Sequence, residues 1–196
     1  VNPLAIDQYG QQYRNFKMLS VRRNELEGER SGIVRFMEEI ESKKRQTFMD
    51  ALEKINASFG QFFEKITGGK GWLQLENVED PFSGGLDMLV QFPSKSPRLV
   101  SAVSGGEKSV SAISFIFAMQ ELKPAPFYIM DEVDAHLDPM NAERFGELVR
   151  ERSGSSQMIA ITLRDVVARK AHRIFGAYVN KGITQIVEMP RRKGEE

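Results

Sequence analysis

The sequence predicts an α/β domain that follows a long helical arm. Three patterns indicate this: apolar residues at coiled-coil spacing in the first third, short alternating segments in the middle, and alternating strands and helices from residue 104 to residue 190. Hydrophobic residues make up 41% of the 196 residues, which is enough for a packed core and too many for a disordered protein.

Composition excludes several classes of protein. The 27 Lys and Arg residues balance 27 Asp and Glu residues, so the chain is not a simple basic nucleic-acid-binding protein, although a local basic face stays open. The absence of Cys excludes disulfides, cysteine-based zinc sites and a cysteine nucleophile, and it fits a reducing compartment. No apolar run has the length of a membrane span, and the N-terminus lacks a signal-peptide pattern. We therefore expect a cytoplasmic protein without a membrane partner.

The first 67 residues are expected to be mostly helical. Apolar residues from Ile6 to Phe16 step by 3, 4 and 3 positions, and the pattern resumes in a shifted frame as far as Ile40. Nine basic and eight acidic residues over 1–50 nearly balance, which is typical of a solvated, ion-paired helix face. Gly28 and Gly32 weaken this arm by about 1 kcal/mol each relative to Ala, and they predict a break or a bend.

The arm is expected to lead into a globular core. A dense apolar stripe runs from Phe48 to Ile66, and the glycine-rich segment 67–71 ends the helix. We therefore assign residues 1–47 to a coiled-coil arm and residues 48–196 to the globular part. Short strands at 72–75 and 86–92 predict an antiparallel lobe.

Strands and helices alternate in the last part of the chain. We expect helices over 104–122 and over 139–152, with Asp138 capping the second helix. Continuous apolar runs at 127–130 and 158–162 predict two buried parallel strands. Segments 174–179 and 183–187 predict a hairpin, and the tail 191–196 is expected to fray.

The most informative segment is the start of the helix at residue 104. Ser104, followed three residues later by Glu107, forms a capping-box pattern. Gly105 and Gly106 leave the backbone N–H groups of the first turn uncovered, and a helix N-terminus with exposed N–H groups attracts anions such as phosphate. The simpler alternative is an ordinary capped helix.

Two carboxylates follow the first buried strand. Asp131 and Glu132 stand at its carboxyl end, the edge where α/β sheets bind ligands. One carboxylate at this place can hold Mg²⁺, directly or through water, and the second can polarise an attacking water. The simpler alternative is a strand that ends in solvated acids.

Together these segments resemble the signature and Walker B motifs of ABC-type ATPases. The continuation Val133-Asp134-Ala135-His136-Leu137-Asp138 resembles the structural maintenance of chromosomes (SMC) family in particular, in a form typical of its prokaryotic, including archaeal, members. The arm, the Phe-rich helix that ends in Thr-Gly-Gly, and the strands before the signature also resemble the C-terminal half of an SMC head. The resemblance covers nearly the whole chain.

The resemblance implies roles for the signature residues. Ser104, Gly105 and Gly106 would contact the γ-phosphate of ATP held by an opposing head. Glu107 and Lys108 complete the motif, and the place of Glu107 in the capping box favours a capping role over a catalytic one.

The resemblance also implies roles for the acidic segment. Asp131 would bind Mg²⁺ through water, Glu132 would be the general base, and Leu137 and Asp138 would form the loop that signals across a dimer of heads. Leu163 stands where many ABC ATPases have a His, and leucine cannot hydrogen-bond a γ-phosphate. That contact is then missing or is supplied by backbone or by Arg164.

No segment matches the phosphate loop Gly-x-x-x-x-Gly-Lys-Ser/Thr, since Gly71 follows Lys70. We therefore expect half of an ABC-type head, inactive alone, whose phosphate loop lies in the N-terminal half of the same head. The family implies further partners: a second head with ATP and Mg²⁺ between the two, a kleisin subunit, and DNA in the nucleoid. Residues 43–45 are basic and suit either DNA phosphates or a solvated helix face.

Two other functions stay open. One is an ABC ATPase of DNA double-strand-break repair paired with a nuclease, against which the Val133-Asp134 continuation argues. The other is a purely structural coiled-coil protein, against which the signature and Walker B segments argue.

Overall fold

The computed structural model describes residues 4–189, so the tail predicted to fray lies outside the described residues. The chain forms two compact units, residues 1–50 and residues 51–196. In the described part of the chain, no helix combines the length and the apolar character that a membrane span requires.

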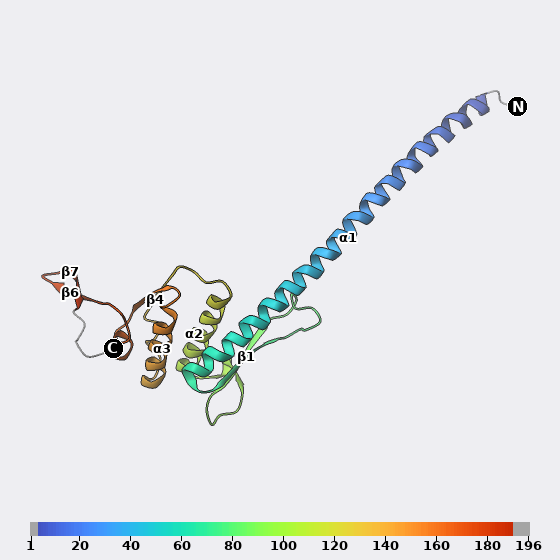
Figure 1. Ribbon diagram of the computed structural model, residues 1–196. Coiled ribbons are helices and arrows are strands. Elements are labelled where there is room, and N and C mark those ends of the chain that lie inside the picture. Colours follow the sequence, from blue (N-terminus) through green and yellow to red (C-terminus); the bar gives the residue numbers. More distant parts are fainter. Residues whose placement is uncertain (1–3, 190–196) are drawn as a thin grey trace. The chain divides into compact units, whose positions relative to one another are not determined.

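The helical arm is one uninterrupted helix, α1, from Leu4 to Thr67 (Figure 1). Of the break or bend expected at Gly28 and Gly32, the break is wrong, because a cost of about 1 kcal/mol at each glycine does not interrupt a helix of 64 residues. The apolar residues of the heptad pattern are exposed, as in a coiled-coil strand without its partner; they include Ile6, Tyr9, Phe16, Ile33 and Phe36. Ion pairs such as Arg22–Glu25 at 3.1 Å lie on the solvated face.

The end of α1 falls where the glycine cluster predicts it. The hydroxyl of Thr67 donates to the carbonyl of Phe63 at 2.7 Å and accepts the N–H of Gly69 at 2.9 Å. Gly68 then takes a φ of +71°, a left-handed conformation that favours glycine and turns the chain into the first strand.

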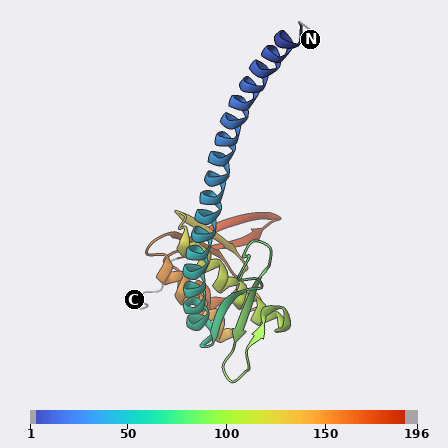
Figure 2. The ribbon, with the colours of Figure 1, turned by 90° about the vertical axis from the view of Figure 1, so that its right-hand side faces the viewer.

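Strands β1 (Lys70–Leu75), β2 (Leu86–Gln91) and β3 (Arg98–Leu99) form the predicted antiparallel lobe. Trp72 pairs with Leu89 in the register of β1 and β2. Figure 2 shows this sheet in green beside the last turns of α1. A single 3₁₀ turn, η1 (Val100–Ala102), leads from β3 into helix α2 (Gly105–Leu122).

Aromatic residues build the core of the second unit. The ring centroids of Phe62 in α1 and Phe117 in α2 lie 5.8 Å apart, and those of Phe117 and Phe145 lie 6.2 Å apart. Phe145 belongs to helix α3 (Pro139–Arg152), whose N-cap is Asp138 as predicted. Three helices therefore share one apolar core, to which Phe59, Phe63 and Ile66 also contribute.

Strands β4 (Phe127–Asp131) and β5 (Gln157–Ile161) pair in parallel around α3, as predicted. The prediction that both strands are buried is wrong for one of their faces. Met130 is buried, but the exposed fractions are 55% for Phe127, 62% for Ile129 and 52% for Ile161. Parallel strands are usually covered on both faces, and the described residues cover only one face of this pair.

The last elements are a short helix and a hairpin. Helix α4 (Asp165–Ala168) follows β5 and lies beside α3. Strands β6 (Ile174–Asn180) and β7 (Ile183–Met189) form the predicted antiparallel hairpin. Its two-residue turn has positive φ at both Lys181 and Gly182, which matches the right-handed twist of the strands. Apolar residues on the hairpin are exposed, among them Phe175, Val179, Ile183 and Ile186.

Candidate functional site

The N-terminus of α2 is capped as the sequence predicts, and its tip is open. The backbone N–H of Ser104 donates to the Glu107 carboxylate at 3.0 Å, and the Ser104 hydroxyl donates to it at 2.9 Å. Ser104, Gly105 and Lys108 are exposed, while Gly106 and Glu107 are half-buried. The tip can therefore receive an anion from outside this chain.

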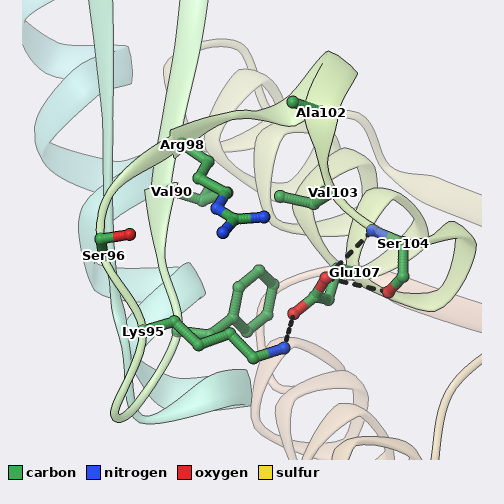
Figure 3. A pocket seen from close by; sticks show the side chains of 9 residues that line it. Val90, Lys95, Ser96, Arg98, Ala102, Val103, Ser104 and Glu107 are labelled. Carbon is green, nitrogen blue, oxygen red and sulfur yellow. Dashed lines mark hydrogen bonds and ion pairs between the residues drawn. The ribbon is translucent and has the colours of Figure 1, made fainter.

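A lysine from the loop between β2 and β3 neutralises the capping carboxylate of Glu107. Lys95 Nζ lies 2.8 Å from Glu107 Oε1, and Figure 3 shows the pair below the start of α2. The hydrogen bond from Lys95 holds the pKa of Glu107 below its ordinary value, and the Ser104 bonds act in the same direction. Sequence reasoning missed Lys95, because no spacing rule links a loop lysine to a helix N-terminus.

A cavity of about 230 Å³ opens beside this ion pair. Its wall joins the β2–β3 segment to the start of α2, and Figure 3 shows the side chain of Arg98 extending into it. The lining residues are Val90, Phe92, Lys95, Ser96, Arg98, Ala102, Val103, Ser104 and Glu107. Lys95 and Glu107 neutralise each other in this wall, so the positive field of the surface comes from Arg98 and the open helix tip.

The tip of α2 touches the loop that follows β4. A Cβ built on Gly106 would lie 2.9 Å from the carbonyl oxygen of His136, whereas one built on Gly105 would meet nothing within 4 Å. Gly106 thus permits close packing of two backbones, and Gly105 leaves the tip uncovered. This contact brings together the two segments that the sequence singles out.

Asp131 and Glu132 occupy the carboxyl end of β4, and both are exposed. Glu132 has a φ of +49°, which is uncommon for a residue with a long side chain. Its N–H donates to the carbonyl of Ile161 at 2.9 Å, so the residue is tied to the end of β5. The two carboxylates are therefore available to a ligand at the sheet edge.

The oxygen chemistry at this edge suits Mg²⁺. Mg²⁺ is usually held by one or two carboxylates, waters and substrate phosphates rather than by an all-protein cage. Asp131 supplies one exposed carboxylate of this kind. Over residues 4–189 there is no group of three or more His, Cys, Asp or Glu side chains that could hold a metal without such help.

The loop after Glu132 places Leu137 and Asp138 differently. The Leu137 side chain is 3% exposed and belongs to the hydrophobic core, so it cannot itself reach a partner. Asp138 is exposed and accepts the N–H of Asn141 at 2.9 Å as the N-cap of α3. Of the two residues, only Asp138 presents its side chain to solvent.

A buried acid links this loop to the segment after β5. Asp134 is 2% exposed, and its Oδ2 accepts the hydroxyl of Thr162 at 2.5 Å. Leu163 points into solvent with 91% of its surface exposed, and Arg164 donates from its guanidinium to the carbonyl of Ala135 at 2.9 Å. Sequence reasoning quoted Asp134 only as part of a motif, since its burial is visible only in three dimensions.

Comparisons with known proteins identify the family of this chain. The family model described as RecF/RecN/SMC N terminal domain matches residues 8–185. The chain is 42% identical over 194 residues to the chromosome partition protein Smc of Pyrococcus furiosus, and 42% identical over 189 residues to that of Aquifex aeolicus. These alignments cover 98% and 96% of this chain but 16% of each relative, so the chain spans about a sixth of their length.

Solved structures are similar over most of the chain. An Smc head domain with a coiled coil and joint from Pyrococcus yayanosii has a TM-score of 0.90 and 43% identity, over 98% of this chain and 38% of that one. An Smc head from Pyrococcus furiosus bound to the C-terminal domain of ScpA has a TM-score of 0.87 and 41% identity, over 94% of this chain and 47% of that chain. A structure from work on ATP-driven dimerization and DNA stimulated activation of SMC ATPases has a TM-score of 0.71 and 42% identity, over 76% of this chain and 91% of that chain.

Proposed function

Because the chain belongs to the RecF/RecN/SMC N-terminal domain family and has the α/β fold of an SMC head with its coiled-coil helix, we propose that it is the C-terminal half of the ATPase head of a prokaryotic SMC protein. The family description names an N-terminal domain, and the C-terminal assignment is our inference from the motifs. Signature and Walker B segments are present, while no segment fits a phosphate loop.

The observation that carries this proposal is the contact between Gly106 and His136. It holds an open helix tip next to the loop that follows Glu132. An anion-binding tip and a pair of carboxylates at a sheet edge serve one reaction when two such units face each other. In each site, the tip of α2 would contact the γ-phosphate of ATP bound to the opposite head.

The acids serve the nucleotide on their own side. Asp131 would hold Mg²⁺, directly or through water, and Mg²⁺ when bound would neutralise charge on the β- and γ-phosphates. Glu132 would accept a proton from the attacking water as the general base. Asp138, exposed at the start of α3, would meet the opposite head, while Leu137 anchors its own loop in the core.

The N-terminal half of the head is the first partner. The open face of β4 and β5 exposes Phe127, Ile129, Ile159 and Ile161, and it supports a partner that completes the sheet. That half would bring the phosphate loop, so this chain alone would not hydrolyse ATP. The exposed heptad residues of α1 support a second helix that completes the coiled coil.

Two further partners are proposed by similarity. Smc heads from Pyrococcus furiosus bind the C-terminal domain of ScpA, and other SMC ATPases show DNA stimulated activation. We infer that the full protein binds a kleisin subunit and nucleoid DNA and organises chromosomes through ATP-driven engagement of its heads. A double-strand-break repair ATPase is not favoured, because the relatives named above, at 42% identity, are chromosome partition proteins.

The test compares this chain alone, the full-length protein, and the full-length Glu132→Gln variant. Phosphate release is measured with malachite green, and head dimerisation with ATP by size exclusion. We expect turnover only from the full-length wild type, and a stabilised ATP-bound dimer from Glu132→Gln because binding persists without the base. Robust turnover by the isolated chain would contradict the assignment.

A further inference from the structure

We propose that Asp134 and Thr162 form a positioning pair that holds Glu132 in place from the segment after β5, an inference that rests on the function proposed above. The pair belongs to three consecutive contacts between residues 132–135 and residues 161–164. We call this set of contacts the clamp.

The first contact acts on Glu132 itself. Its backbone N–H donates to Ile161 at 2.9 Å, and its carbonyl accepts the N–H of Ala135 at 3.1 Å. The φ of +49° at Glu132 is a strained conformation that persists only where surrounding structure enforces it. The backbone bonds on both sides of Glu132 supply part of that enforcement.

The second contact orients the Thr162 hydroxyl. This hydroxyl donates to Asp134 Oδ2 at 2.5 Å, so its hydrogen points at the carboxyl of Asp134. The lone pairs of the same hydroxyl are then free for the N–H of Arg164, which they accept at 2.9 Å. Asp134 thereby sets the turn that follows β5, although its 2% exposure keeps it away from any substrate.

The third contact closes the clamp. The Thr162 turn leaves Leu163 in solvent and directs Arg164 back to the carbonyl of Ala135 at 2.9 Å. Arg164 therefore braces the loop after the general base instead of reaching toward solvent. The backbone that carries Glu132 is held at 132, 134 and 135, so its carboxylate needs little reorganisation to activate water.

The experiment measures steady-state ATP hydrolysis, ATP-driven dimerisation and thermal melting of the full-length protein. Thr162→Val removes the hydroxyl without changing the shape of the side chain, and Thr162→Ser restores the hydroxyl. Ser114→Ala is the matched control, since its buried hydroxyl bonds only within α2, to Val110 at 2.9 Å. Arg164→Ala opens the third contact from a partly exposed position.

We expect Thr162→Val to lower kcat by about 10- to 100-fold, the size of effect that misplacing a catalytic group produces, while KM and dimerisation stay near wild type. Thr162→Ser and Ser114→Ala keep wild-type kcat. Arg164→Ala lowers kcat in the same direction, which keeps the test informative if Thr162→Val melts early.

A positioning role also predicts non-additivity. In a Glu132→Gln background, Thr162→Val adds no further loss, because the residue it positions is already inactive. A kcat for Thr162→Val equal to wild type, or an equal loss with and without Glu132, overturns the clamp. If the wild type itself fails to hydrolyse ATP, or Glu132→Gln leaves hydrolysis unchanged, the function proposed above fails as well.

Discussion

Gly106 and His136 approach so closely that a Cβ on Gly106 would stand 2.9 Å from the His136 carbonyl oxygen. The contact joins the first turn of α2 to the loop between β4 and α3. No side chain fits between the two backbones, so glycine is required at 106 for packing. At 105, by contrast, the space is open.

The two glycines therefore predict opposite effects of the same substitution. Gly106→Ala must displace the His136 loop, and we expect a loss of about 1 kcal/mol in the free energy of unfolding, since overpacking exceeds the gain in helix propensity. Gly105→Ala stays within about 0.5 kcal/mol of wild type because its Cβ enters solvent. Urea titrations of the full-length protein measure both values, and equal stabilities of the two variants would contradict this account.

The Lys95–Glu107 pair predicts a pH-dependent contribution to stability. Lys95 holds the pKa of Glu107 below the ordinary value of 4.5, so the contribution is present above that value and is lost as pH falls through the lowered pKa. Lys95 is 62% exposed, and solvent limits the contribution to about 0.5 kcal/mol. We expect Lys95→Met to lower the free energy of unfolding by this amount at pH 7 and to match wild type in strong acid, with Lys108→Met as the exposed control. A deficit that persists unchanged in strong acid would exclude the ion pair as its source.

Much of this architecture was accessible from local patterns. The capping box at Ser104, the cap at Asp138, the hairpin turn at 180–182 and the stop at Thr67 each depend on neighbours within a few residues. Features of this kind can be predicted from a short stretch of sequence, because all the residues that form them are close together in the chain.

The features that escaped prediction are all long-range. The apolar run of β4 predicts burial of both faces, but burial also requires a segment that covers each face. The described residues cover only one face of β4. Asp134 looks like any loop acid until β5 brings Thr162 beside it, and Lys95 meets Glu107 only through the fold of the lobe. Gly28 and Gly32 failed as break signals because about 1 kcal/mol each does not interrupt a 64-residue helix.

Two Ser-Gly-Gly segments in this chain allow a controlled test of the helix tip. Ser104→Arg places a bulky cation over the tip of α2, and we expect loss of ATP-driven head dimerisation with ATP binding to each head retained. Ser83→Arg is the matched control, because Ser83 lies in an exposed turn before β2. Size exclusion with ATP, together with equilibrium nucleotide binding, measures both effects. Normal dimerisation of Ser104→Arg would contradict the contact in trans.

The left-handed backbone of Glu132 predicts that glycine at this position gives a more stable protein than alanine. A left-handed conformation costs a residue with a Cβ about 1 kcal/mol relative to Gly. We therefore expect the free energy of unfolding of Glu132→Gly to be about 1 kcal/mol higher than that of Glu132→Ala. Both variants lack the carboxylate and should be equally inactive, which separates the backbone effect from the chemistry. Denaturant midpoints of the two full-length variants give the comparison. Equal stability would mean that the φ of +49° relaxes without cost, and the clamp would then have no strain to oppose at this residue.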